Sequence, residues 1–211
     1  RSAPVIDRED NYQDMLAAVQ AFHDKHHLRQ QGGEDMPYRV ALMAEELGEI
    51  SACVTKGKTT DALAEECADL LILLIGTAIA ADFKLDEAFW IKMVNRSAPV
   101  IDREDNYQDM LAAVQAFHDK HHLRQQGGED MPYRVALMAE ELGEISACVT
   151  KGKTTDALAE ECADLLILLI GTAIAADFKL DEAFWIKMVK LAQRKSRIVD
   201  GRIRVSNFQD D

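Results

Sequence analysis

The feature that most limits how this chain can fold is a perfect internal repeat. Residues 1–94 recur without one change as residues 96–189, and only Asn95 and the tail 190–211 lie outside the repeat. Natural tandem duplications accumulate differences, so this identity indicates either a recent or engineered duplication or two copies of one polypeptide written as one sequence. We favour the second interpretation. We therefore expect two copies of one domain, at 1–94 without a C-terminal tail and at 95–211 with one.

Charge and cysteine content argue against several classes of protein. The formal net charge is −13, whereas general binding to nucleic acid or to an anionic membrane needs a positive surface. Cys53 and Cys67 of the first repeat lie in apolar helical stretches, which predicts free buried thiols in a reducing cytoplasm. No segment resembles a signal peptide, and the most apolar run, 70–81, is too short to span a bilayer. We expect a cytoplasmic protein that binds neither nucleic acid nor membrane.

Hydrophobic periodicity predicts helices along the whole repeat. The expected helices of the first copy run from Asp10 to about His27, from Asp35 to about Lys56, from about Asp61 to Ala81, and from Asp86 onward. In the second copy we expect the last helix to reach about Arg197. Only the short segment 202–205 has some strand character.

An all-α fold follows, with an antiparallel four-helix bundle in each repeat. The second half of the third helix, residues 70–81, is apolar on every side and should be buried all round. This helix has more apolar surface than three neighbours cover. We therefore expect the two repeats to pair in a dimer-like assembly, and the protein to self-associate as a dimer or tetramer.

Two acidic motifs interrupt otherwise apolar helix faces. Residues 45–49 read Glu-Glu-Leu-Gly-Glu, and residues 65–69 read Glu-Glu-Cys-Ala-Asp. Residues three apart share a helix face, so each motif places a pair of acids on one side of its helix. Leu42 and Leu73 lie one turn from these acids, which therefore belong to stripes that face the core.

A divalent cation is the natural partner for such inward acids. Carboxylates on an inward face lose hydration, and acids that converge raise one another's pKa values. Oxygen-only ligands fit Mg²⁺ or Mn²⁺ better than Zn²⁺. The alternative is a non-catalytic helical scaffold or interaction module whose acidic faces are solvated. A di-iron bundle is disfavoured because it needs Glu-x-x-His pairs, and neither motif contains histidine.

The pattern Glu45-Glu46-x-x-Glu49 followed by Glu66-x-x-Asp69 resembles the signature of the MazG-like all-α nucleotide pyrophosphohydrolases, over most of each repeat. The resemblance implies Mg²⁺-dependent hydrolysis of nucleoside triphosphates, with deoxynucleotides favoured, to monophosphate and pyrophosphate, a nucleotide-pool cleansing role. It implies these metal ligands: Glu46, Glu49, Glu66, Asp69, Glu141, Glu144, Glu161 and Asp164. Glu45 and Glu140 would be catalytic acids that position the attacking water.

A basic stripe on the fourth helix is expected to contact the phosphates. Lys187, Lys190 and Arg194 share one face of this helix,; the alternative is a solvated basic face near a helix C-terminus. In the first copy only Lys92 corresponds. If the duplication is covalent, the first site is either impaired or borrows residues from the second copy.

Aromatic and histidine side chains add candidates for nucleotide binding. Phe22, Tyr38 and Trp90 can stack on a base, with core packing as the alternative role. One of the histidines near the end of the first helix can approach the base or the phosphates. No residue pattern identifies the preferred base or sugar.

Overall fold

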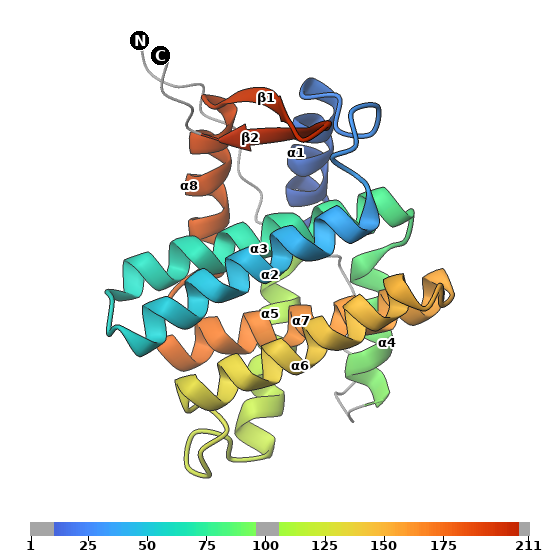
Figure 1. Cartoon of the computed structure of the whole chain (residues 1–211). Helices are drawn as coiled ribbons and strands as arrows, with labels where there is room; N and C mark the ends of the chain where they lie inside the picture. Colours follow the sequence, from blue (N-terminus) through green and yellow to red (C-terminus); the bar gives the residue numbers. More distant parts are fainter. Residues whose placement is uncertain (1–10, 96–105, 207–211) are drawn as a thin grey trace.

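The structure is a computed structural model that describes residues 11–95 and 106–206 (Figure 1). Its elements are α1 (Tyr12–Lys25), α2 (Met36–Thr55), α3 (Thr60–Ala81), α4 (Leu85–Asn95), α5 (Tyr107–Lys120), α6 (Met131–Thr150), α7 (Thr155–Ala176), α8 (Leu180–Ala192), β1 (Lys195–Val199) and β2 (Arg202–Ser206). The prediction of a predominantly helical protein is confirmed. Asp10, the predicted start of the first helix, lies outside the described residues.

Capping residues explain where the helices begin. Asp35 and Thr59 each accept a hydrogen bond from the backbone N–H three residues further on. Asn11 accepts one from the N–H two residues further on. These contacts satisfy N–H groups that have no partner within the helix. The predicted starts of α2 and α3 are therefore confirmed.

The core is built from the central helices of both copies. α2 packs on α3 and α6 on α7, while α2 also contacts α6 and α3 contacts α7 (Figure 1). Leu70, Leu74 and Ile75 of α3 are fully buried, as the all-round apolar pattern predicts, whereas Leu73 and residues 79–81 are only partly buried. Full burial of each such side chain stabilises the fold by about 1.5–3 kcal/mol relative to exposure.

The fourth helices are exchanged between the copies. α8 packs on α3 of the first copy, and α4 packs on α7 of the second copy. Asp82 ends α3 in a left-handed conformation with φ of 58°, and the short connection to α4 directs the chain toward the other copy. Phe89 and Phe184 are fully buried on these exchanged helices. The arrangement therefore differs from a self-contained four-helix bundle in each repeat, because each third helix is covered by a helix of the other copy.

The C-terminal tail differs from the predicted helix. α8 ends at Ala192, and β1 and β2 pair as an antiparallel hairpin. Asp200 and Gly201 at its turn have φ values of 50° and 76°, the positive angles that a two-residue hairpin turn requires and that Asp-Gly favours. The prediction of a helix to Arg197 was wrong, whereas the strand signal at 202–205 did mark β2.

The hairpin lies on the first copy, next to α1 (Figure 1). The Ile203 N–H donates a hydrogen bond to the backbone oxygen of Gln31, in the α1–α2 loop, at 3.0 Å. Lys25 of α1 donates from Nζ to the backbone oxygen of Ala192 at 2.9 Å. The tail of the second copy thus covers one end of the first.

Neither disulfides nor membrane spans contribute to the described fold. The four cysteines are buried and free, which confirms the prediction of unpaired thiols. No helix in the ranges 11–95 and 106–206 combines the length and the apolar character needed to cross a membrane.

Candidate active site

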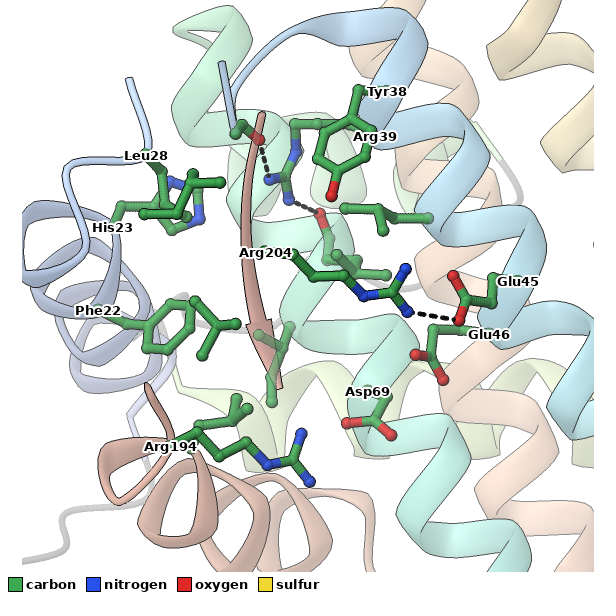
Figure 2. Close-up of a pocket in the computed structure, with 17 residues that line it drawn as sticks. Phe22, His23, Leu28, Tyr38, Arg39, Glu45, Glu46, Asp69, Arg194 and Arg204 are labelled. Atoms are coloured by element: carbon green, nitrogen blue, oxygen red, sulfur yellow. Dashed lines mark hydrogen bonds and ion pairs between the residues drawn. The ribbon is translucent and has the colours of Figure 1, made fainter. Parts of the chain in front are cut away.

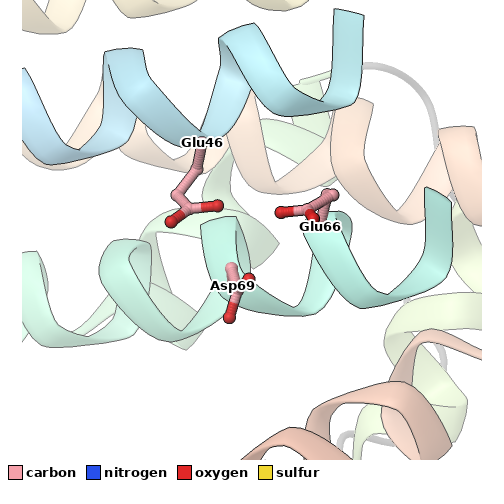
Figure 3. Close-up of side chains that lie close together, drawn as sticks. All are labelled: Glu46, Glu66 and Asp69. Carbon is pink, nitrogen blue, oxygen red and sulfur yellow. The ribbon is translucent and has the colours of Figure 1, made fainter. Parts of the chain in front are cut away.

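Three carboxylates converge in each copy. Oxygen atoms of Glu46, Glu66 and Asp69 lie within 4.8 Å of one another, and Figure 3 shows the side chains meeting between α2 and α3. The equivalent group of the second copy consists of Glu141, Glu161 and Asp164. Of the eight carboxylates that were assigned to a metal from the sequence, six therefore converge in the structure, in two groups of three.

The other two assigned ligands, Glu49 and Glu144, lie outside these groups. Both side chains are exposed. Glu144 still acts on its group electrostatically: burial and the charges of Asp164 and Glu144 raise the pKa of Glu161, although a hydrogen bond to Glu141 and the charge of Lys92 oppose the shift. Glu49 and Glu144 thus stand at the solvent side of the three-carboxylate groups.

Burial and mutual repulsion shift the titration of the converging acids. Burial, the charge of Asp69 and a hydrogen bond to Glu66 together raise the pKa of Glu46 to about 8. The equivalent causes raise the pKa of Glu141 to about 7. Burial also raises the pKa of Asp69 to about 6, although the neighbouring Lys187 opposes this shift. At neutral pH such a group holds a proton or takes up a cation.

The donor set fits a hard divalent cation. All the converging donors are carboxylate oxygens, which Mg²⁺ and Mn²⁺ prefer. Oε2 of Glu141 is buried and has no hydrogen-bond partner among the described residues. Leaving a buried polar atom without a partner costs about 1–3 kcal/mol, and a bound cation would satisfy this oxygen.

Each carboxylate group faces a lysine from the fourth helix of the other copy. Nζ of Lys187 lies 3.1 Å from Asp69 Oδ2 and 3.1 Å from Glu65 Oε1. Nζ of Lys92 lies 3.1 Å from Asp164 Oδ2 and 2.8 Å from Glu160 Oε1. Lys187 is only 5% exposed, so its ammonium group is held inside the site. The exchange of α4 and α8 therefore places both lysines at the carboxylates.

The rest of the predicted basic stripe serves the first copy. Nζ of Lys190 lies 3.2 Å from Glu65 Oε1, and Arg194 lines the pocket beside Asp69. Asn95 and Pro99 occupy the equivalent sequence positions in the other copy, and Pro99 lies outside the described residues. The site formed by the first copy thus borrows its basic residues from the second, one of the two outcomes that the sequence left open.

A pocket opens beside Glu46 and Asp69 (Figure 2). Its walls come from α1, α2 and α3 of the first copy and from the end of α8 and β2 of the second. The apolar residues in these walls are Phe22, Leu28, Leu42, Ile72, Leu73, Leu191, Ile203 and Val205. The cavity is small, about 150 Å³, against roughly 300–1,000 Å³ for a typical small-molecule site, so in this conformation it can enclose a nucleotide only in part.

Arg39 forms a buried polar part of this pocket that the sequence prediction missed. Its guanidinium donates to Thr77 Oγ1 at 3.1 Å, to the Gly33 oxygen at 3.2 Å and to the Leu73 oxygen at 2.8 Å. Gly76 leaves room for this group, since an added Cβ would clash with Arg39 Nη2. The available signal was spacing: Arg39 lies one turn before Met43, on the stripe that faces the core.

His23 also lines the pocket, as expected for a histidine near the end of the first helix. Its Nδ1 lies 2.9 Å from Glu34 Oε1, and Glu34 also accepts a hydrogen bond from Arg29 Nε at 2.8 Å. Burial lowers the pKa of His23, although the bond to Glu34 opposes the shift. Glu34 therefore fixes the orientation of the imidazole ring.

Arg204 is the second residue that the sequence prediction missed. Its Nη2 lies 3.0 Å from Oε1 of Glu45 at the pocket mouth, and Figure 2 shows this contact. Glu45 and its counterpart Glu140, the assigned catalytic acids, are both exposed. Alternate residues of a strand share a face, so Arg202 and Arg204 of β2 point to the same side. The sequence predicts this pair only if the segment is first recognised as a strand.

Fold and site together define a predominantly helical protein in which three converging carboxylates of each copy lie beside a pocket. Residues 133–199 match the sequence model of the MazG nucleotide pyrophosphohydrolase domain. The matched segment contains Glu141, Glu161 and Asp164, and residues 38–94 of the first copy repeat its first part without change. The match confirms the resemblance to the MazG-like superfamily. No curated protein and no solved structure matches the chain.

Proposed function

We propose that the protein hydrolyses nucleoside triphosphates, preferentially deoxynucleotides, to monophosphate and pyrophosphate, and so removes unwanted nucleotides from the pool. The observation that carries the proposal is the convergence of Glu46, Glu66 and Asp69 beside a pocket bordered by cationic side chains. A scaffold with solvated acids would leave such carboxylates exposed. Asp164 is instead 7% exposed, and because it converges with Glu141 and Glu161, the charge of Lys92 alone does not balance the negative charge of this group.

We assign one Mg²⁺, or Mn²⁺ as a substitute, to each three-carboxylate group. Glu49 and Glu144, one helical turn from Glu46 and Glu141, are assigned as additional ligands that reach the ion by side-chain rotation. The bound ion would neutralise charge on the phosphates and lower the pKa of a water molecule. The protein's part is to hold these oxygen ligands together in a partly buried site.

The cationic residues bind the triphosphate. Lys187 already lies between Asp69 and Glu65, where its ammonium group could contact a phosphate oxygen of a bound triphosphate. Arg194 reaches the same region from the end of α8 (Figure 2). Lys190 and, at the other site, Lys92 have the same role. Fixed cations at the phosphates stabilise the negative charge that develops in the transition state.

Glu45 and Glu140 act as general bases. Glu45 lies at the mouth of the pocket next to Glu46, where it can accept the proton of an attacking water molecule. The water oxygen forms a bond to the α-phosphorus as the bond from this phosphorus to the α,β-bridging oxygen breaks. Pyrophosphate leaves, and the base and sugar remain in the apolar part of the pocket, near Phe22 and Tyr38.

The test is product analysis with a panel of nucleotides. Ribo- and deoxynucleoside triphosphates are incubated with Mg²⁺, and monophosphate, pyrophosphate and orthophosphate are quantified. The double variant Glu46→Gln, Glu141→Gln should lower turnover by about 100-fold or more, while circular dichroism shows an unchanged helical content. Release of orthophosphate in place of pyrophosphate would reject the assigned bond cleavage.

Two further properties belong to the same proposal. Buried free thiols suit a reducing compartment, so we propose that the protein acts in the cytoplasm. Self-association of the chain as a dimer or tetramer stays a prediction, and multi-angle light scattering of the purified protein tests it.

A further inference from the structure

The two sites have the same sequence on α2, α3, α6 and α7 but differ in what covers them. We call the pocket at Glu46 the first site and the pocket at Glu141 the second site. The tail of the second copy lines the first site with five side chains: Leu191, Arg194, Ile203, Arg204 and Val205. Within the described residues, the pocket at Glu141 is lined by α5, α6, α7 and the α5–α6 loop alone.

The hairpin is docked on the first site through specific contacts. Nη2 of Arg202 lies 3.3 Å from Asp35 Oδ2, and its guanidinium carbon lies 5.7 Å from the centre of the Tyr38 ring. A Cβ added to Gly32 would lie 3.2 Å from Cγ of Arg202, and one added to Gly33 would lie 3.0 Å from Cγ2 of Ile203. The Gly32-Gly33 pair therefore permits the close approach of β2.

The equivalent surface of the second copy lacks this cover among the described residues. A Cβ added to Gly127, the counterpart of Gly32, would meet no heavy atom within 4 Å. Tyr133, the counterpart of Tyr38, is 52% exposed, and His121 is exposed whereas its counterpart His26 is buried. Identical sequences thus have different surroundings because the chain carries one tail for two sites.

The tail also makes the two sites unequal in charge. Arg194 and Arg204 extend from it toward the carboxylates of the first site (Figure 2), in addition to Lys187 and Lys190. Among the described residues, the second site receives only Lys92 from the other copy. Guanidinium groups bind phosphate oxygens in pairs, and an enclosed site strengthens such contacts. A triphosphate therefore meets more positive charge and less water at the first site.

For the two repeats joined in one covalent chain, the other interpretation of the repeat, we propose that the C-terminal hairpin makes the first site the tight nucleotide site, with Arg194 and Arg204 as its specificity-determining phosphate ligands, and leaves the second site weak. The ligand is the Mg²⁺ complex of a nucleoside triphosphate, so the inference rests on the proposed function. Glu45 holds Arg204 at the pocket mouth before the nucleotide enters. The guanidinium then binds the phosphates in place of Glu45, and Glu45 can accept the proton of the attacking water molecule.

Calorimetric titration tests the inequality. The full chain is titrated with an α,β-methylene deoxynucleoside triphosphate in the presence of Mg²⁺, because this analogue binds without being cleaved. We expect one tight binding event per chain and a second event at least about tenfold weaker, since two charge-assisted contacts are missing there.

Variants at equivalent positions assign each event to a site. Glu46→Gln should remove the tight event and leave the weak one, whereas Glu141→Gln should remove the weak event and leave the tight one. The two substitutions occur in identical local sequences, so each is the matched control of the other. Arg194→Ala with Arg204→Ala should weaken the tight event by about tenfold or more. Lys179→Ala, which removes an exposed positive charge that lines neither site, should change neither event.

The outcomes separate this inference from the proposed function. Two equal binding events, or equal losses of affinity from Glu46→Gln and Glu141→Gln, would overturn the inference. Mg²⁺-dependent release of pyrophosphate would still support the proposed function in that case. Unchanged tight binding in the double arginine variant would also overturn it. If no triphosphate is bound or hydrolysed with Mg²⁺, the proposed function fails and the inference fails with it.

Discussion

At the scale of single residues, Glu46 shows that a carboxyl group of the site needs a cation beside it in order to ionise at neutral pH. Its carboxyl group has a pKa raised to about 8 because it is buried next to Asp69 and Glu66. An unfolded chain ionises the same group near its ordinary pKa of about 4.3. As the pH rises between these two values, ionisation favours the unfolded state, and the folded state without metal loses stability.

This shift predicts a pH dependence of metal binding. Because Mg²⁺ must displace the proton of Glu46, the rise in melting temperature caused by Mg²⁺ should be small at pH 6 and should increase up to about pH 8,. Without metal, the parent protein should become less stable over the same range, and Glu46→Gln should reduce this loss. Thermal unfolding from pH 5 to 9, with and without Mg²⁺, measures both effects. An equal Mg²⁺ effect at pH 6 and pH 8 would contradict the assignment of Glu46 as a ligand.

The sequence predicted residues of the site only where local spacing determines their direction. Glu46, Glu66 and Asp69 were found because residues three apart share a helix face and their neighbours are apolar. Glu49 has the same spacing but is exposed. The helix face that carries both residues is partly buried at Glu46 and reaches solvent one helical turn later, at Glu49. Arg39 was missed because a single arginine on an apolar stripe does not reveal that Thr77 and the Leu73 oxygen will bind it.

At the scale of secondary-structure elements, the helices were predicted well and the C-terminal tail was not. Asp35, Thr59 and the apolar periodicity define α2 and α3 without help from distant contacts. The tail 193–206 has no comparable periodicity, and extending the fourth helix to about Arg197 overlooked that the Asp200-Gly201 turn makes the residues before it a strand, β1. The hairpin also depends on tertiary contacts with Gln31 and Asp35, which no local pattern contains.

The hairpin turn offers a test of this element. Gly201 has a φ of 76°, so Gly201→Ala should strain the turn by about 1–2 kcal/mol. We expect looser docking of β2 and a nucleotide affinity that falls by up to roughly tenfold, with no change in the Mg²⁺ effect on melting temperature. Ser196→Ala, on the exposed part of β1, is the control. If affinity is unchanged in Gly201→Ala while hydrogen exchange shows the hairpin opening, β2 does not contribute to the site.

At the scale of the whole molecule, the exchange of α4 and α8 joins the two repeats into one structure. Each third helix is closed by a fourth helix that comes from the other copy, and each carboxylate group takes its lysine from there. Hydrophobic pattern alone showed that α3 needs more cover than its own repeat supplies. It could not show which copy provides that cover, because both fourth helices have the same apolar face.

This exchange predicts the behaviour of the second repeat expressed alone. Residues 95–211 contain α5 to α8 and the hairpin, but α7 in this fragment lacks the helix that α4 supplies in the full chain. A second molecule of the fragment can supply α8 instead, so we expect a homodimer in which each hairpin covers the partner's pocket. Both sites should then bind nucleotide equally tightly, in contrast to the unequal sites of the full chain.

Light scattering and calorimetry on residues 95–211 test whether this fragment is a homodimer with two equally tight sites. Residues 1–94 form the matched control, because they carry the same α1–α3 sequence but lack Arg194 and Arg204. This fragment should bind nucleotide at least about tenfold more weakly than residues 95–211, since the two guanidinium contacts are missing. A stable, folded monomer of residues 95–211 with a closed α8–α7 contact would show that α8 can serve its own repeat. The exchange seen in the full chain would then reflect the covalent connection between the repeats and not a requirement of the core.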